Sequence, residues 1–377
     1  MSQRYAFIAE WLDPSSGVLW RYQLFYYNDT NELEMFDIKN RRHFLKRIKY
    51  DGVTLQQLYI GSTIVVYARQ LRLIEYGDEF TRQSIETRAE KTLALIKPDA
   101  VQHMGRIINA ITTSGFSITD MRMCQLGRAD AEAFYAVHAG RPFFSNLCSF
   151  MTSGPIVALE LMAASSIRKW RDLLGPTDSS TARQQAPGSI RALFGSDGTR
   201  NAVHGSDSPV NAAAELSFFF GKGSSVGGCA RCSGTTLGLI KPHAVKDGLA
   251  GMMLDCIQEV FDVTGLQLFA LDKPAAAEFL EVYKGVVAPG EFTAMVDELV
   301  AGPSIAVEVA DREGDEAAEP FRQLCGPLDP ELGRVLRPNS LRARFGVSRV
   351  RNGIHCTDLQ EDGQLETSYF FNILQVA

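Results

Sequence analysis

The stretch TLALIKPDAV at residues 92–101 recurs almost unchanged as TLGLIKPHAV at residues 236–245. The correspondence continues, because SGP at 153–155 matches AGP at 301–303 and RNAVHGSD at 200–207 matches RNGIHCTD at 351–358. Such self-similarity indicates a duplicated structural unit. The separation between the copies drifts only from 144 to 151 residues. The sequence therefore predicts two homologous domains, at residues 91–220 and 235–377.

Each copy alternates strand-like and helix-like segments. In the first copy, residues 92–96 are short and apolar and end at Lys97-Pro98, whereas residues 104–113 space their isoleucines helically. Further strands are predicted at 116–126 and 155–161, and further helices at 131–137, 144–151 and 167–174. This order is typical of an α+β fold, a ferredoxin-like split βαβ sheet covered by helices.

Two segments lie outside the repeats. Residues 1–88 contain a predicted β-hairpin, 21–27 and 32–36, and strand-like runs at 63–68 and 71–76, so they predict a small, mainly β module. Residues 221–234 hold five Gly and three Ser in fourteen positions. That composition favours a flexible linker between the two domains.

A basic run crosses the amino-terminal module and is interrupted by apolar residues. It is typical of a solvated face on a partly packed strand or helix, and the alternative is a surface for an acidic protein such as tubulin. Its members are Lys39, Arg41, Arg42, Lys46, Arg47 and Lys49.

Composition narrows the class of protein. The chain has 377 residues, of which 45% are hydrophobic and 22% charged, which is usual for globular domains. Neither a membrane-spanning run nor a secretory signal is evident, so we expect a cytoplasmic protein. The net charge is −6, and residues 221–377 carry 14 basic against 22 acidic groups, which argues against nucleic-acid binding there.

The seven cysteines fit reduced thiols better than a disulfide framework. Cys229 and Cys232 form the one close pair. Their spacing could serve zinc or redox chemistry, but no second pair stands at zinc-site distance, and the flanks are rich in Gly and Ser. We expect no dedicated metal site.

Neither copy contains a P-loop, the protein-kinase triplets or a dinucleotide GxGxxG after a strand. Both copies instead keep a lysine after the first strand, two arginines, an asparagine and a histidine, a set that can surround a phosphate chain. In the first copy these are Lys97, Arg171, Arg191, Asn201 and His204, and in the second they are Lys241, Arg322, Arg342, Asn352 and His355.

His204 is the candidate nucleophile of this set. A neutral imidazole can accept a phosphoryl group covalently near physiological pH, and the lysine and arginines would stabilise the charge in transit. The alternative is a structural histidine, which we would favour for an isolated residue. His103 and His138 lack comparable neighbours in the sequence, so we expect surface or packing roles for them.

These residues resemble those of the nucleoside diphosphate kinase family, whose hallmark NxxHGSD reads Asn201 to Asp207 here. Other family motifs agree over residues 91–220: KPDAV at 97–101, RPFF at 141–144, SGP at 153–155, R-x-x-x-G-x-T at 171–177 and PGSIR at 187–191. The resemblance implies a ping-pong reaction in which His204 is phosphorylated, with Mg²⁺ arriving on the nucleotide. It also implies base stacking by Phe143, phosphate and ribose contacts from Lys97, Tyr135, Arg171, Thr177, Arg191 and Asn201, and support of the histidine by Ser206 and Glu215.

The second copy resembles the same family but departs from it at several positions. By sequence offset, Tyr283 pairs with Tyr135, so Lys241, Tyr283, Arg322, Arg342 and Asn352 are its expected nucleotide contacts and His355 its candidate nucleophile. However, HGSD becomes HCTD, KPD becomes KPH, the threonine becomes Leu328 and the base-stacking phenylalanine becomes Glu291. These changes leave open whether this copy is an enzyme or a structural partner of the first.

One β module followed by two such repeats resembles the ciliary members of the family. This resemblance implies a place in the cytoplasm and cytoskeleton, on the axonemal doublet microtubules of a cilium or flagellum, with tubulin or doublet proteins as partners. Two hypotheses follow. In the first, the chain exchanges phosphate between nucleoside triphosphates and diphosphates. In the second, it is chiefly a structural microtubule component with weak activity or none.

Overall fold

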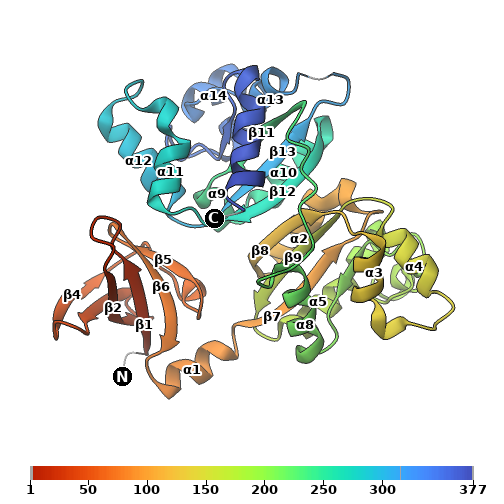
Figure 1. Cartoon of the computed structure of the whole chain (residues 1–377), viewed down its shortest axis with the longest axis horizontal. Coiled ribbons are helices and arrows are strands. Elements are labelled where there is room, and N and C mark those ends of the chain that lie inside the picture. The colour runs from red at the N-terminus through yellow and green to blue at the C-terminus, as the bar shows by residue number, and fades with distance from the viewer. Residues whose placement is uncertain (1–2, 315, 376–377) are drawn as a thin grey trace.

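The computed structural model describes residues 3–314 and 316–375. Figure 1 shows three parts, an amino-terminal module and the two repeats, domain A and domain B. The outermost residues of the predicted segments 1–88 and 235–377 lie outside the described ranges. Within those ranges, no helix is both long and apolar enough to cross a bilayer.

The amino-terminal module is one antiparallel six-stranded sheet with an adjoining helix. The strand order is β4-β3-β2-β1-β6-β5. The module buries one face, as the alternating burial along β2 indicates, and this face forms a separate apolar core. Its elements are β1 (Arg4–Leu12), β2 (Leu19–Tyr27), β3 (Glu32–Asp37), β4 (Arg42–Lys49), β5 (Thr63–Val66), β6 (Arg69–Tyr76) and α1 (Glu79–Glu86).

The predicted hairpin is confirmed as β2–β3, and the basic run lies on the turn into β4 and on β4 itself, an edge strand whose last four residues are all exposed. We did not predict β1, since RYAFIAEWL places apolar residues at consecutive positions and so hides the alternation of a strand.

Domain A has four strands, with the order β10-β7-β9-β8. Helices cover both faces, and the predicted helices 104–113 and 144–151 are confirmed at those bounds as α2 and α4. The elements are β7 (Glu90–Ile96), α2 (Met104–Thr113), β8 (Ser117–Cys124), α3 (Arg128–Phe134), η3 (Ala136–His138), α4 (Phe144–Met151), β9 (Ile156–Ala163), α5 (Ser166–Leu174), α6 (Ser179–Gln185), α7 (Ile190–Phe194), β10 (Val203–Gly205) and α8 (Pro209–Phe220).

Domain B repeats this arrangement, with the order β12-β13-β11-β14. The predicted ferredoxin-like α+β class is therefore confirmed for both copies. The elements are β11 (Thr235–Ile240), α9 (Pro242–Lys246), α10 (Ala250–Val260), β12 (Asp262–Phe269), α11 (Lys273–Phe279), η4 (Glu281–Tyr283), α12 (Pro289–Leu299), β13 (Ser304–Ala310), α13 (Ala318–Cys325), α14 (Pro330–Leu336), α15 (Leu341–Phe345), β14 (Ile354–Cys356) and α16 (Gly363–Ser368).

The two domains join edge to edge into one eight-stranded sheet. Their shared centre is the β8–β12 pair, which meets at Arg122 and Gln267. On one face α2 crosses α10 at close range: a Cβ on Gly105 would lie 2.3 Å from Asp255 N, and one on Gly251 would lie 2.3 Å from Asn109 N. One apolar cluster runs through both domains beneath these helices. The repeats therefore form an intramolecular pair.

The linker 221–234 differs from our expectation of flexibility. Val226 is buried, and its carbonyl oxygen accepts a hydrogen bond from Arg122 Nη1 at 3.0 Å. Arg231 N and Cys232 N donate to the buried carboxylate of Glu308. The composition suggested a flexible linker. Instead, backbone N–H groups of the segment bind the Glu308 carboxylate on β13, and these hydrogen bonds hold the segment in place.

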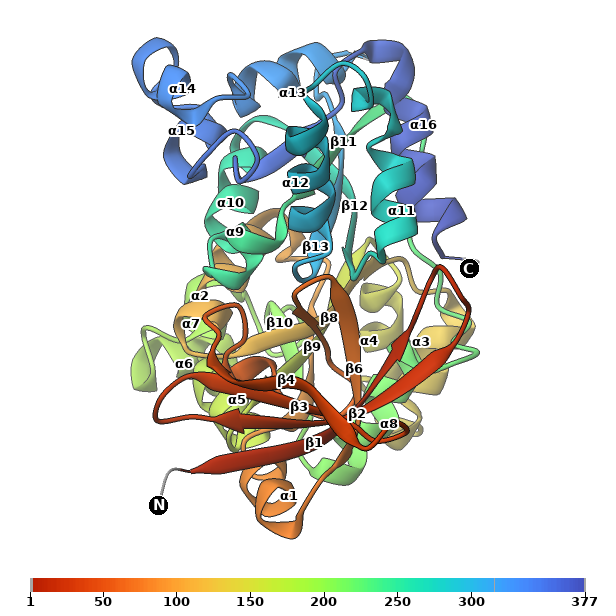
Figure 2. The ribbon, with the colours of Figure 1, turned by 90° about the vertical axis from the view of Figure 1, so that its left-hand side faces the viewer.

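The module contacts both domains. The Tyr59 ring lies against domain A, where burial and then the neighbouring Glu160 and Asp120 carboxylates raise the pKa of its hydroxyl to about 12. Lys91 Nζ is 5.8 Å from the centre of the same ring. Gln70, on β6 directly after the β5–β6 turn, donates from Nε2 to Leu271 O of domain B at 2.8 Å. Figure 2 shows the module lying across domain A with this turn directed at domain B.

Candidate functional site

His204 lies on the short edge strand β10, which pairs with β7 so that the histidine stands opposite Leu95. Its Nε2 is 3.2 Å from both carboxylate oxygens of Glu215, on α8. Ser206 Oγ donates to the same carboxylate at 2.6 Å. An ionised carboxylate accepts, so in the neutral imidazole Nε2 carries the proton and Nδ1 keeps the free lone pair. Ser206 and Glu215 therefore both lie beside the histidine.

The loop around His204 is held by backbone contacts. Trp170 Nε1, on α5, donates to His204 O at 3.2 Å. Gly205 follows directly, where a Cβ would lie 2.5 Å from the Trp170 ring. The glycine of the HGSD motif is therefore required by the tryptophan behind it.

Three cationic side chains of domain A lie close enough to affect one another. Burial and then the Arg191 guanidinium lower the pKa of Lys97 to about 8. Burial and then Arg171 lower the pKa of Arg191 to about 10. Mutual repulsion of this kind is relieved by an anion bound among them. The cluster is thus suited to a phosphate chain.

Asn201 links the cations to the surrounding loops. Lys97 Nζ donates to Asn201 Oδ1 at 2.6 Å and to Thr199 O at 3.1 Å. Asn201 Nδ2 in turn donates to Thr177 O at 2.9 Å. Of the predicted contacts, Lys97, Thr177 and Asn201 thus belong to one hydrogen-bonded network.

An aromatic row leads from His204 to the surface. The Tyr135 ring stands edge-on to His204 at 6.2 Å and stacks on His138 at 6.3 Å, and His138 lies 5.5 Å from Phe143. Phe143 is 47% exposed. His138, for which we expect a surface or packing role, instead lies between two predicted nucleotide contacts. Its isolated position in the sequence gives no signal of this proximity.

The pairing of Tyr135 with Tyr283 is wrong. Tyr135 caps α3 and is followed by η3, which ends at His138, whereas Leu280 caps α11 and is followed by η4, which ends at Tyr283. Tyr283 therefore matches His138, because domain B has three extra residues after this turn. Its ring still reaches His355, edge-on at 6.4 Å, and its hydroxyl donates to Asp358 Oδ2 at 2.7 Å.

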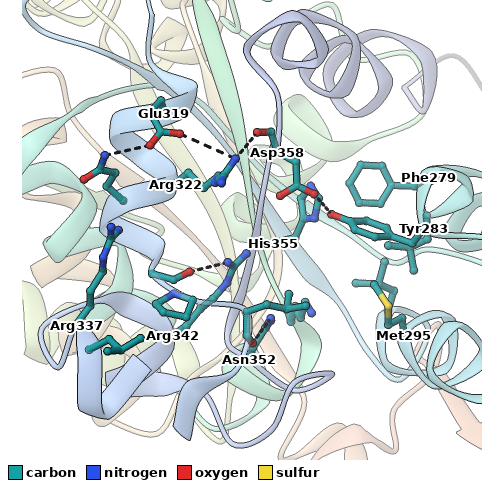
Figure 3. A pocket seen from close by; sticks show the side chains of 18 residues that line it. Phe279, Tyr283, Met295, Glu319, Arg322, Arg337, Arg342, Asn352, His355 and Asp358 are labelled. Atoms are coloured by element: carbon teal, nitrogen blue, oxygen red, sulfur yellow. Dashed lines mark hydrogen bonds and ion pairs between the residues drawn. The ribbon is translucent and has the colours of Figure 1, made fainter. Parts of the chain in front are cut away.

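Domain B encloses a cavity of about 640 Å³ around His355. Figure 3 shows Arg322, Arg342 and Asn352 around it, as the sequence predicts, together with Arg337 and Met295, which no sequence motif singles out. His355 Nε2 lies 2.9 Å from Glu366 Oε2, the counterpart of Glu215, so its Nδ1 is likewise free. The offset of 151 residues between the histidines would have identified Glu366.

The lysine of domain B is more deeply buried than a typical lysine. Burial and then Arg342 lower the pKa of Lys241 to about 7. Lys241 Nζ donates to Val350 O at 2.8 Å, as Lys97 does to Thr199 O. The phosphate half of the site is thus built alike in the two domains.

The replacements in domain B are accommodated by neighbouring changes. His243 stands where Asp99 accepts from Ala202 N, and it keeps the acceptor role, because its Nε2 accepts from Gly353 N and its Nδ1 donates to Glu298. Cys356 replaces the HGSD glycine, and Phe321 replaces the larger Trp170. The site therefore remains ordered although its motif has changed.

The seven cysteines are free thiols in the structure, and five of them are buried. Among the described residues no cluster of three or more His, Cys, Asp or Glu side chains could hold a metal ion. Cys229 and Cys232 instead contribute to the packed linker, where the Cys229 thiol donates to Thr264 O.

Comparison with known proteins agrees with this geometry. The family model "Nucleoside diphosphate kinase" matches residues 90–224 and 234–376, and the model "Nucleoside diphosphate kinase 7 N-terminal PH domain" matches residues 1–87. The chain is 49% identical to nucleoside diphosphate kinase homolog 7 of Rattus norvegicus, over 99% of this chain and 94% of that protein. It is 50% identical to the nucleoside diphosphate kinase of Wolinella succinogenes, over 35% of this chain and 95% of that protein.

A solved structure, the nucleoside diphosphate kinase of Aquifex aeolicus, is similar to 35% of this chain and 95% of its own, with 45% identity and a TM-score of 0.35. Both repeats thus match one family model, and a relative of the same family matches nearly the whole length. The chain belongs to the nucleoside diphosphate kinase family.

Proposed function

We propose that domain A transfers the terminal phosphoryl group of a nucleoside triphosphate to a nucleoside diphosphate through a phosphorylated His204. The observation that supports this proposal best is the His204–Glu215 contact, which in the neutral imidazole places the proton on Nε2 and the lone pair on Nδ1, with the cations of Lys97, Arg171 and Arg191 nearby. A nucleophile with a free lone pair and a set of fixed positive charges is what phosphoryl transfer requires.

In the first half-reaction, His204 Nδ1 attacks the γ-phosphorus, the bond from that phosphorus to the β-phosphate oxygen breaks, and the diphosphate leaves with the bonding electrons. In the second, a terminal oxygen of another nucleoside diphosphate attacks the same phosphorus, and the bond to Nδ1 breaks. Glu215 stabilises the positive charge on the ring while the phosphoryl group is attached.

Magnesium fits this site as a companion of the nucleotide. The described residues offer no protein cage, and Mg²⁺ is commonly held by phosphates, waters and one or two carboxylates. Asp207 is the available carboxylate, and a hydrogen bond from Asn211 keeps its pKa below the usual value. The ion would neutralise charge on the phosphates.

The test is labelling with a γ-³²P nucleoside triphosphate. We expect acid-labile label on the full chain and loss of nearly all of it in His204→Gln, together with loss of exchange. His355→Gln is the matched control for the second copy. Equal labelling of wild type and His204→Gln would contradict the assignment.

We further propose that the chain acts on ciliary axonemal microtubules, where the amino-terminal module binds tubulin or doublet proteins. The support is the family resemblance and the row of exposed cations on and beside β4, which suits an acidic surface. Deleting residues 1–88 should abolish axonemal retention and leave nucleotide exchange nearly unchanged. Retention of the truncated chain would place the binding surface in the repeats.

The alternative function is a structural one, with domain B as a folded surface. The replacement of a base-stacking phenylalanine by Glu291 favours it for that copy. A chain that binds doublet microtubules but shows no label on either histidine would support this alternative.

A further inference from the structure

An ion pair in domain B joins α12 to the loop that precedes Asn352. Arg349 Nε lies 3.2 Å from Glu291 Oε1, and the two side chains are 52% and 26% exposed. The next residue, Val350, accepts the hydrogen bond of Lys241 Nζ. The pair therefore lies beside the phosphate half of the site, at the surface.

The loops that carry Gly198 and Arg349 are the same loop in the two domains. In domain A, the amides of Ser196 and Asp197 both donate to Arg200 O. In domain B, the amides of the matching residues 347 and 348 both donate to the matching oxygen, Arg351 O. Gly198 and Arg349 thus occupy equivalent backbone positions. Beside Gly198 a Cβ would meet no atom within 4 Å, so this space in domain A is open.

The helices that carry Phe143 and Glu291 are equivalent in the same way. Both α4 and α12 end at a cap, Thr152 and Val300, that lies nine residues after the position in question. Phe143 and Glu291 therefore stand at one register. Where domain A has an exposed phenylalanine and, on the other element, a glycine with open space beside it, domain B has a carboxylate bound to a guanidinium, which offers no flat apolar surface to a base.

The Glu291–Arg349 pair lines a surface pocket next to the domain B cavity, and the cavity itself carries an added positive charge. Arg337 follows α14 and lines the cavity, while its counterpart after α6 is Ala186. Among the described residues, its side chain has no hydrogen-bond or ion-pair partner. It joins Lys241, Arg322 and Arg342, so the cavity keeps every cation of domain A and gains one.

We propose that the domain B cavity is a base-independent polyphosphate site, which binds the phosphate chain of a nucleotide or an inorganic polyphosphate with similar affinity. The inference takes the proposed nucleotide site of domain A as its reference. The Glu291–Arg349 pair occupies the position where a base would stack, so that the cations bind the ligand through its phosphate charge alone.

The test is amide hydrogen exchange of the full chain, read segment by segment during titration with MgATP or inorganic tripolyphosphate. For residues 337–358, we expect the two ligands to give half-maximal protection at concentrations that agree within about threefold. For residues 191–207, ATP should give half-maximal protection at a concentration at least about tenfold lower than tripolyphosphate does. This ratio is about what one base–aromatic stack contributes to binding.

A double substitution then introduces the two domain A residues of the base position into domain B. Glu291→Phe with Arg349→Gly should lower the ATP concentration needed in domain B by about tenfold and leave that of tripolyphosphate unchanged. Lys273→Ala is the matched control, because it removes another exposed ion pair to α12, with Asp297. Thermal unfolding verifies that each variant is folded.

Either of two results would overturn the proposal: wild-type domain B preferring ATP by the ratio seen in domain A, or no protection of residues 337–358 by either ligand. Absence of ATP protection in residues 191–207 would instead count against the proposed function of domain A. The two failures appear in different peptides and are therefore distinguishable.

Discussion

A carboxylate that fixes one histidine nitrogen is the residue-scale feature common to both sites. Glu215 and Glu366 each follow their histidine by eleven residues on the next helix, and each also accepts a hydroxyl hydrogen bond, from Ser206 or Thr357. The serine-to-threonine change therefore keeps the contact.

We predict that Glu215→Gln lowers the exchange rate by about 10- to 100-fold, the range found when the carboxylate that orients a metal-bound histidine is removed. The amide keeps the shape but cannot stabilise the ring charge. Steady-state kcat at saturating nucleotide measures the effect, and Glu366→Gln is the control in domain B. An unchanged kcat with a raised KM would show that Glu215 acts only in binding.

Lys97 gives a pH prediction. Its pKa is about 8 in the folded protein, below about 10.4 for a free lysine, so the unfolded chain binds more protons between these values and stability rises with pH across that window. The affinity for phosphate should instead fall as pH rises, because binding needs the charged amine of Lys97.

The ADP affinity of the His204→Gln chain should therefore be level up to about pH 8 and fall by as much as about tenfold per pH unit above it, up to about pH 9.5. Lys97→Arg, which keeps its charge, should remove the slope. Titration with ADP at fixed ionic strength, with amide protection of residues 191–207 as the readout for domain A alone, measures the affinity of both chains. A flat profile for the unaltered lysine would contradict the assignment.

At this scale, sequence reasoning identified the residues whose chemistry is written in a motif. Lys97, Asn201 and His204 were found because duplication repeated them. Arg337 and Arg349 were missed because they matter only in comparison with the domain A residues at the same positions, Ala186 and Gly198. His138 was missed because the residues that it contacts lie at the end of one helix and the start of the next.

Among the elements, the α2–α10 contact depends on two glycines. An alanine at Gly105 or Gly251 would press a methyl group against the other helix's backbone. Such overpacking costs about 1–3 kcal/mol, partly offset by about 1 kcal/mol of helix propensity.

The double variant Gly105→Ala, Gly251→Ala should therefore unfold at a lower urea concentration than the wild type. Gly290→Ala is the control, since Gly290 lies in α12, where an added Cβ would meet no atom within 4 Å. Equal midpoints for the double variant and the wild type would mean that the helices separate without cost.

Periodicity of the apolar residues predicted helices such as α2 and α4, whose bounds agree at both ends. It missed β10 and β14, which have three residues each and take their strand form from pairing with a buried neighbour. Composition misjudged the linker, because Glu308, far away in the sequence, fixes it.

For the whole molecule, the contact between the module and domain A contains a half-buried carboxyl group. Burial, and then nearby Glu160, raise the pKa of Asp120 to about 6, beside the Tyr59 ring. The folded chain therefore binds more protons than the unfolded one between about pH 4 and pH 6. Stability should fall as pH rises through that range and then level off.

Asp120→Asn should remove this slope and raise stability at pH 7 by no more than about 3 kcal/mol. Urea unfolding between pH 4 and pH 7 measures it, and Asp172→Asn, at an exposed carboxylate, is the control. A slope that persists in Asp120→Asn would assign the titration to another group.

Because the two domains share one sheet within one chain, dilution cannot separate them. Two separate subunits would part at low concentration, but here a fourteen-residue segment presents each half to the other at an effective concentration on the order of millimolar. The pairing thus survives at any expression level. One domain can lose catalytic activity without becoming a free subunit that competes for partners, since both domains are always made in equal amounts.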